Sequence, residues 1–228
     1  MYNFVLNRSV NTKVMAKRIE WQDEYWLLLI QLYLQKPEGV KHLFSRGLVD
    51  IALELHIPPK DLHTRMYRLR QIDTPRLQRL WDEYAGNPRK LRRGVKLLRQ
   101  MNGFGNADAF YAGVGVNESW ERDFKPIGGT PFSPMMLTIV LDLYFRLTPV
   151  TMAVETPEVI ELARLMHVAP GDIVGVLDIF MAYDPYMRHA KAVSSPLTAH
   201  CQELWAQYGN DDPEKLAALA AQMKEYFK

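Results

Sequence analysis

The sequence predicts an all-α fold made of two tandem helical repeats, each containing a helix-turn-helix unit. Residues 47–73 have the pattern of a helix, a proline turn and a second helix. The same pattern returns 111 positions later, at residues 158–184. Residue pairs at this constant offset are Ala52 and Ala163, His56 and His167, Pro59 and Pro170, Asp61 and Asp172, and Asp73 and Asp184. The repetition predicts a duplicated unit of about four or five helices, whose copies we expect to pack about a pseudo-two-fold axis.

Residues 1–19 form an N-terminal arm that has no acidic residue and four basic ones, Arg8, Lys13, Lys17 and Arg18. Such an arm suits contact with DNA, as in homeodomains, but it also fits a frayed terminus, which we favour. The first repeat, residues 20–101, begins with an apolar stretch from Trp21 to Gln35. Because its apolar residues cover more than one face, we expect this helix at the centre of its unit.

The helix-turn-helix unit of the first repeat has two amphipathic helices separated by Pro58 and Pro59. A proline fits the first position of a helix because its missing N–H has no partner there in any case. The apolar stripe of the second helix consists of Leu62, Met66 and Leu69. The opposite face carries the residues that we expect to contact DNA, which are Lys60, His63, Thr64, Arg65 and Arg68.

Two further helices complete the first repeat. Residues 77–84 form an amphipathic stretch, and Asn87 with Pro88 has the pattern of an N-cap followed by a first-turn proline. The helix that follows has a narrow apolar stripe and many cations. Its cations that we expect to contact DNA are Arg89, Arg92, Arg93, Lys96 and Arg99. This helix follows a phosphate backbone or, alternatively, is a solvated helix whose long aliphatic stems cover the core. A membrane-surface role suits it less, because its apolar side is small and lacks aromatic residues.

Residues 102–132 are dense in glycine and lack periodicity, so we interpret them as a linker. Aromatic residues predict that this linker packs against the repeats, and they are Phe104, Phe110, Tyr111, Trp120 and Phe124. The second repeat, residues 133–228, starts with another N-cap pair, Ser133 and Pro134. After an insertion at residues 186–198, the pattern of the first repeat resumes, with Trp205 matching Trp81 and Pro213 matching Pro88.

The span from Thr156 to Pro185 resembles the helix-turn-helix region at the N-terminus of bacterial HNH endonuclease-like proteins. The matching pieces are LDLYFRL at residues 141–147, the segment TPEVIELARLMHVAPGDIV and the closing Asp184-Pro185. The resemblance implies a helix-turn-helix fold and a bacterial DNA-binding protein. No HNH nuclease domain follows the repeats in this sequence, so the resemblance does not imply nuclease activity.

Both units place a histidine, His56 or His167, at a turn position where helix-turn-helix proteins favour glycine. That position often requires a left-handed backbone, which glycine adopts freely and histidine only at some cost. The matched use of histidine predicts a structural role, such as capping carbonyls at the end of the helix.

Charge is divided unevenly along the chain. Residues 1–101 hold 19 Lys/Arg and 10 Asp/Glu, a net charge of +9, whereas the remainder holds 9 and 16, a net charge of −7. This asymmetry indicates that only one half meets a polyanion, although mutual attraction between the halves explains it as well. In helix-turn-helix proteins the second helix enters the major groove. There Arg65 or Arg68 would bind guanine, contributing roughly 1–3 kcal/mol of discrimination.

The second repeat has no cation at the corresponding positions, which hold Asp172, Ile173, Val174, Gly175, Val176 and Asp178. We therefore expect the second repeat to pack against a protein partner or to self-associate. The predicted function is that of a non-enzymatic DNA-binding protein that regulates transcription and contacts duplex DNA through the first repeat. The alternative is a helical protein–protein interaction module that has kept the fold without binding DNA.

Other function classes have weak support. The six histidines show no HExxH or other metal-ligand spacing, and the glycine-rich segments lack the lysine of a phosphate-binding loop. The single cysteine, Cys201, cannot form an internal disulfide, and no apolar run reaches the roughly 20 residues of a membrane span. We therefore expect no enzymatic activity, no cofactor, no metal, no membrane partner and a cytoplasmic location.

Overall fold

The computed structural model describes residues 21–101, 104, 119–187 and 194–228. Within these residues the regular structure is helical and no strand occurs, so the predicted all-α class is confirmed. The N-terminal arm predicted at residues 1–19 lies outside the described residues, as do Phe110 and Tyr111 of the linker.

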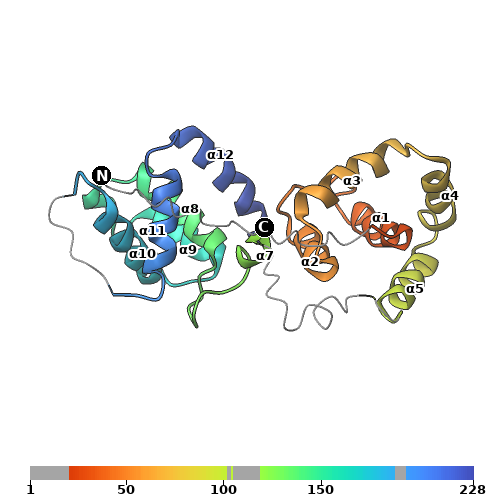
Figure 1. The fold of residues 1–228 in the computed structure, drawn as a ribbon, viewed down its shortest axis with the longest axis horizontal. Helices are drawn as coiled ribbons and strands as arrows, with labels where there is room; N and C mark the ends of the chain where they lie inside the picture. The colour runs from red at the N-terminus through yellow and green to blue at the C-terminus, as the bar shows by residue number, and fades with distance from the viewer. Residues whose placement is uncertain (1–20, 102–103, 105–118, 188–193) are drawn as a thin grey trace, which may run out of the picture.

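The first half is built around α1 (Trp26–Leu34), which follows the 3-10 turn η1 (Asp23–Tyr25). The side chains of residues 25–30 and of Leu32 are buried, so α1 is covered on most of its circumference, as expected for a central helix. Four helices pack against it (Figure 1), and they are α2 (Arg46–Leu55), α3 (Pro59–Gln71), α4 (Pro75–Tyr84) and α5 (Pro88–Arg99).

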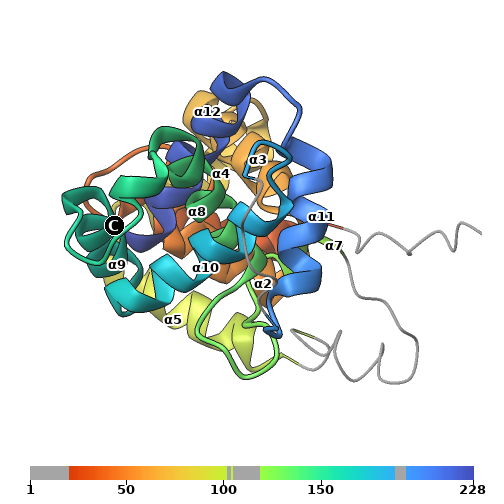
Figure 2. The same ribbon diagram turned by 90° about the vertical axis from the view of Figure 1, so that its left-hand side faces the viewer.

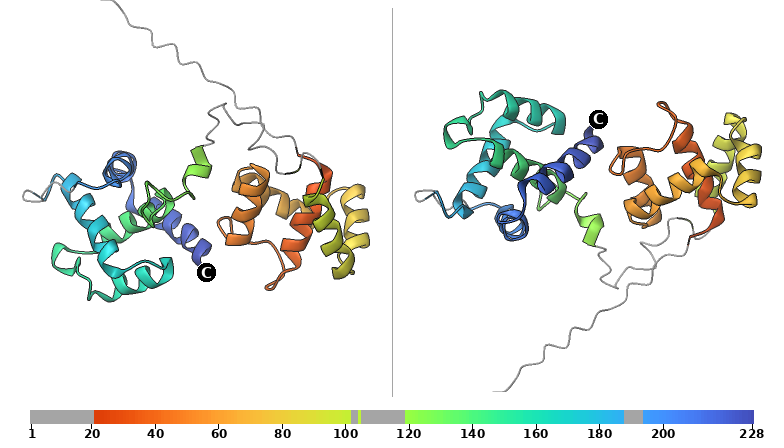
Figure 3. Two further views of the ribbon diagram at one scale, coloured as in Figure 1. Left: turned by 90° about the horizontal axis from the view of Figure 1, so that it is seen from below. Right: turned by 90° about the horizontal axis from the view of Figure 1, so that it is seen from above.

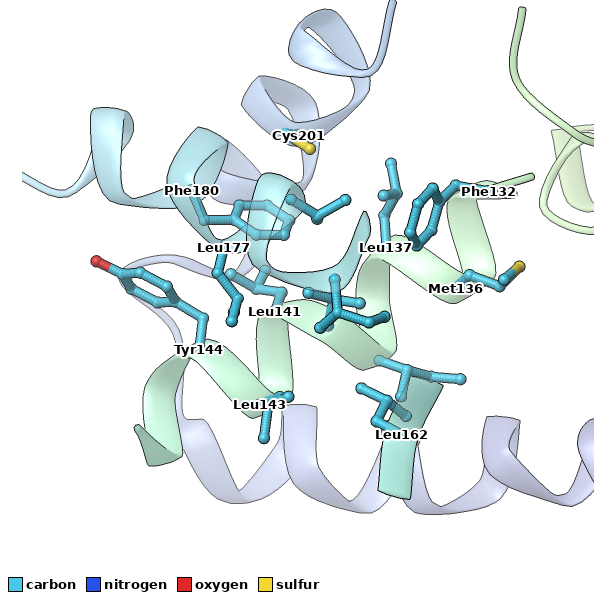
Figure 4. Packing of buried hydrophobic residues seen from close by; sticks show 14 of the residues in the cluster. Phe132, Met136, Leu137, Leu141, Leu143, Tyr144, Leu162, Leu177, Phe180 and Cys201 are labelled. Atoms are coloured by element: carbon cyan, nitrogen blue, oxygen red, sulfur yellow. The ribbon is translucent and has the colours of Figure 1, made fainter. Parts of the chain in front are cut away.

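The second half is built around α8 (Pro134–Arg146), whose residues 135–144 are all buried. Packed against α8 are α10 (Pro170–Tyr183), α11 (Thr198–Tyr208) and α12 (Pro213–Lys224), while α9 (Pro157–Met166) packs on α10. Figure 4 shows Leu141 and Tyr144 of α8 beside Leu177 and Phe180 of α10. Two short 3-10 turns complete this half, η2 (Pro149–Thr151) and η3 (Glu225–Phe227).

Corresponding helices have corresponding bounds. Shifting α2 by 111 residues gives the bounds of α9, and shifting α5 by 125 gives those of α12. The same aromatic pair also occurs in each half. The rings of Tyr33 and Trp81 meet edge to face at 5.6 Å and 84°, and those of Tyr144 and Trp205 meet at 5.6 Å and 80°. From these shared features we infer a duplicated unit, while its pseudo-two-fold arrangement stays a prediction.

Helix starts follow the capping residues that the sequence indicated. The side chain of Asn87 accepts a hydrogen bond from the backbone N–H of Lys90 at 3.0 Å, at the start of α5. Ser133 accepts from the N–H of Met136 at 3.4 Å, at the start of α8. These bonds satisfy amides that have no partner within the helix, so both predicted N-caps are confirmed.

The two halves meet at α2, at α7 (Ser119–Arg122) and at the C-terminal end of the chain (Figures 1 and 3). The Arg46 guanidinium lies 5.7 Å from the centre of the Tyr226 ring, and the rings of Phe44 and Phe124 lie 6.2 Å apart. Trp120 packs against the core of the first half. The predicted packing of the linker is therefore confirmed for its described aromatic residues, and the contact leaves α3 and α5 uncovered.

Within the described residues, no single helix is both long enough and apolar enough to cross a membrane. The helices α9 and α10 reach that threshold only when they are taken together, and the chain bends by 109° between them.

Candidate nucleic-acid interface

A three-residue turn, His56 to Pro58, joins α2 to α3. His56 adopts a left-handed backbone with φ 53°, and His167 does the same with φ 56°, as predicted. The N–H of Ile57 donates to the carbonyl of Ala52 at 3.0 Å, and the corresponding bond in the second half is also 3.0 Å long. The turn therefore caps the last carbonyls of the helix through backbone amides. An angle of 109° between α9 and α10 is typical of a helix-turn-helix.

The imidazole of His56 has a separate contact. Its Nδ1 lies 2.8 Å from Oε1 of Glu121 in α7, with the carboxylate oxygen as the acceptor. Glu121 is only 8% exposed, so this contact holds the turn of the first helix-turn-helix against the second half. No local pattern could predict this contact, because the two residues are 65 positions apart.

One face of α3 is open to solvent. Leu62, Met66 and Leu69 are buried against the core. The exposed stripe on the other side consists of Lys60, Thr64, Tyr67 and Gln71, at spacings of four, three and four residues. Tyr67 is 47% exposed. The stripe carries hydrogen-bonding groups, a cation and a ring, and it includes no acidic residue.

The corresponding face of α10 has different chemistry. The positions 111 residues after the stripe are also exposed, and they hold Gly171, Gly175, Asp178 and Ala182. Glycine and alanine offer no side-chain hydrogen bond, and the aspartate repels phosphate. The two second helices therefore bury similar residues and expose different ones.

His63 lies beside the open stripe of α3. Its ring meets the Tyr67 ring edge to face at 5.1 Å, and it is partly buried. Burial lowers the pKa of His63, so the imidazole is neutral near pH 7 and adds no charge to the stripe.

Two of the arginines predicted to contact DNA bases make contacts within the protein. The guanidinium of Arg65 lies 4.3 Å from the centre of the Trp21 ring, and burial lowers its pKa. Nε of Arg68 donates to Oδ2 of Asp73 at 2.6 Å. Both contacts help to hold α3 in place, and the contact of either arginine with guanine stays a prediction. The sequence could not show this for Arg65, because Trp21 is distant along the chain.

The cations of α5 fall into two groups. Arg99 donates through two nitrogens to both carboxylate oxygens of Glu54, at 2.6 and 2.9 Å, and Lys90 pairs with Glu83 at 2.8 Å. Within the described part of the chain, the remaining four cations have no carboxylate partner, and all are exposed: Arg89, Arg92, Arg93 and Lys96.

The two basic surfaces point in different directions. Figures 1 and 2 show α3 along the upper side of the first half and α5 along its lower side. Both helices pack against α1, which lies between them. The helices that carry Lys60 and Arg93 are therefore separated by α1. The paired arginines Arg68 and Arg99 use carboxylates of the first half itself, so they are not neutralised by the acidic half.

A groove of about 480 Å³ adjoins the stripe of α3. Its lining includes two tyrosines, Tyr33 and Tyr67, one acidic side chain, Glu38, and three basic side chains, Lys41, His42 and Arg70. Nζ of Lys41 donates to the carbonyl of Gln35 at 2.6 Å and also to that of Pro37, so it caps the end of α1. Nε2 of His42 lies 3.9 Å from Oε2 of Glu225, and Arg70 is exposed. Arg70 was not among the residues predicted to contact DNA, although its position on the predicted second helix, three residues after Tyr67, was a signal for it.

Two candidate kinds of reactive site in the described residues are a group of metal-ligand side chains and the single cysteine. No group of three or more His, Cys, Asp or Glu side chains there could hold a metal ion. Cys201 is fully buried, and burial raises the pKa of its thiol to about 12. A thiol in that state is a poor nucleophile near neutral pH.

Comparisons with protein families, with curated proteins and with solved structures gave no match to this chain. The likeness to the helix-turn-helix region of HNH endonuclease-like proteins therefore stays a prediction.

Proposed function

We propose that the first half binds duplex DNA by placing the exposed stripe of α3 in the major groove. One observation carries this proposal. The second helix of a helix-turn-helix exposes Lys60, Thr64, Tyr67 and Gln71, whereas the corresponding face of α10 is acidic and small. In DNA-binding proteins of this fold, the second helix is the one that contacts base edges.

Three side chains of the stripe each suit a distinct contact with DNA. Lys60, at the start of α3, is placed to pair with a phosphate. The Thr64 hydroxyl donates to the carbonyl of Lys60 at 2.9 Å, so its methyl group and its oxygen lone pairs remain for a base edge. Gln71 offers the donor and acceptor pair that suits adenine. Arg70, on the groove beside Tyr67, supplies a second phosphate contact.

The second half is proposed to contact a protein partner rather than DNA. Its exposed apolar groups support this role. Phe145 is 38% exposed and stacks on Trp205 at 5.6 Å, and Val150 and Tyr186 are 90% and 88% exposed. Contact with protein through this half is compatible with DNA binding by the first.

The proposal is tested by measuring duplex binding with the full chain. A preferred sequence is first selected from a random duplex pool, and affinity is then measured by fluorescence anisotropy across a salt series. Tyr67→Ala is expected to weaken binding about fivefold or more, since a good base contact contributes roughly 1–3 kcal/mol. Asp178→Ala changes the corresponding exposed position of α10 and serves as the matched control.

Lys60→Gln is expected to reduce the dependence of log affinity on log salt by about 0.9, the effect of one phosphate contact. Unchanged affinity in both α3 variants, with folding intact by circular dichroism, would show that α3 does not contact DNA.

A further inference from the structure

We propose that α5 is a second duplex-binding surface, so that one molecule holds two DNA segments at once. The first segment lies on α3, and this part of the inference rests on the proposed function. The second segment lies on the exposed side of α5, where the helix contacts the phosphate backbone.

The charge of α5 is the first observation. Five other cations of the first half have a carboxylate partner or stack on a ring: Arg68 with Asp73, Arg76 with Asp23, Lys90 with Glu83, Arg99 with Glu54, and Arg65 over Trp21. By contrast, one helix carries four exposed cations that pair with no carboxylate in the described part of the chain, and these are Arg89, Arg92, Arg93 and Lys96. Four like charges on one helix repel one another, and a polyanion relieves that repulsion.

The orientation of α5 is the second observation. Leu91, Val95 and Leu98 are 2–4% exposed, so the helix is fixed against α1 with its basic side outward. The carboxylates that neutralise Lys90 and Arg99 leave the charge concentrated between residues 89 and 96. At about 1.5 Å per residue this segment spans roughly 10 Å, a length over which a duplex presents several phosphates.

The side chains on this segment suit phosphate. Arginine presents a planar fork of donors that matches phosphate geometry, and three of the four cations are arginines. None of the four residues reads a base edge, so we expect binding here to be independent of DNA sequence and sensitive to salt.

The position of α5 separates this surface from α3. The two helices lie on opposite sides of α1 in Figure 1, and Figure 2 shows α3 and α5 well apart. The second half contacts the first at Arg46 and His56, and Figure 1 shows α5 on the side of the first half away from these contacts. A duplex lying on α3 therefore leaves α5 open to another segment.

The test is a bridging assay with the full chain. One duplex is attached to beads, the second is fluorescent, and captured fluorescence reports molecules that hold both. The combined variant Arg92→Gln, Arg93→Gln, Lys96→Gln is expected to lower capture at least tenfold. It should keep its affinity for the selected duplex, within about threefold, at a salt concentration that suppresses nonspecific binding. Lys90→Gln removes a cation that is already paired with Glu83 and should leave capture unchanged.

The outcomes separate this inference from the proposed function. Equal capture by the combined variant and the unaltered chain would overturn the α5 surface. A third result would overturn both proposals. If the combined variant lost all duplex binding while Tyr67→Ala kept full affinity, α5 would be the single DNA site. A dimer detected by analytical ultracentrifugation, together with capture that the α5 changes do not affect, would give a different explanation. The bridge would then join two protein copies, each holding one duplex.

Discussion

The Tyr144 hydroxyl donates a hydrogen bond to Oδ2 of Asp184 at 2.7 Å, which ties the end of α8 to the residue that follows α10. The corresponding residues of the first half are Tyr33 and Asp73, but there Asp73 accepts from Arg68 instead. Both tyrosines keep the same packing against a tryptophan. The inferred duplication has therefore retained the aromatic contact while the aspartate changed partner.

Tyr144→Phe should lower the free energy of unfolding by about 1–3 kcal/mol, because it removes a hydrogen bond to a charged group from a buried site. Tyr33→Phe is the matched control, since the Tyr33 hydroxyl has no hydrogen bond within the described residues. We expect that control to stay within about 0.5 kcal/mol of the unaltered chain. Urea unfolding followed by circular dichroism measures both, and equal losses in the two variants would contradict the assignment.

Alkaline pH should destabilise the protein through the same tyrosine. Burial, and then the bond to Asp184, raise the pKa of Tyr144 above the ordinary 10.0. Above that pH the unfolded chain releases a proton that the folded chain retains, so this contribution to stability is complete below pH 10 and falls as pH rises beyond it. Unfolding midpoints compared at about pH 9 and pH 11 should fall less in Tyr144→Phe than in the unaltered chain. Tyr25 and Tyr208, whose pKa values burial also raises, supply the residual pH dependence.

Replacing the turn histidines with glycine should affect the two halves differently. His167 is exposed and left-handed, so His167→Gly should stabilise the protein by about 0.5–1 kcal/mol, the strain relieved less the added entropy of the unfolded chain. His56→Gly relieves the same strain but loses the contact with Glu121, so its gain should be smaller or negative. Thermal unfolding of the two variants decides this. A larger gain from His56→Gly would show that the contact across the halves adds no stability.

Much of the fold was predictable because it follows from local chemistry. Asn87 and Ser133 are N-capping residue types, and each precedes a proline and an apolar repeat. The left-handed backbone of the two turn histidines follows from their position directly after the last helical residue. The candidate site was predicted only in part. Lys60 and Thr64 lie on the open face of α3 as expected, but Arg65 turns toward Trp21. A helical repeat of 3.6 residues places Arg65 at the edge of the face, and only a neighbouring element decides which way it points.

The sequence by itself determined the helices, their buried stripes and the division of charge between the halves. Those features depend on residues within a few positions of one another, or on simple counts. The tertiary structure decided which cations are available, because pairing requires carboxylates that lie up to 45 residues away, as Glu54 does from Arg99. It also placed α3 and α5 on opposite sides of α1. That separation depends on how four helices pack around the buried helix α1, and no local sequence pattern encodes this packing.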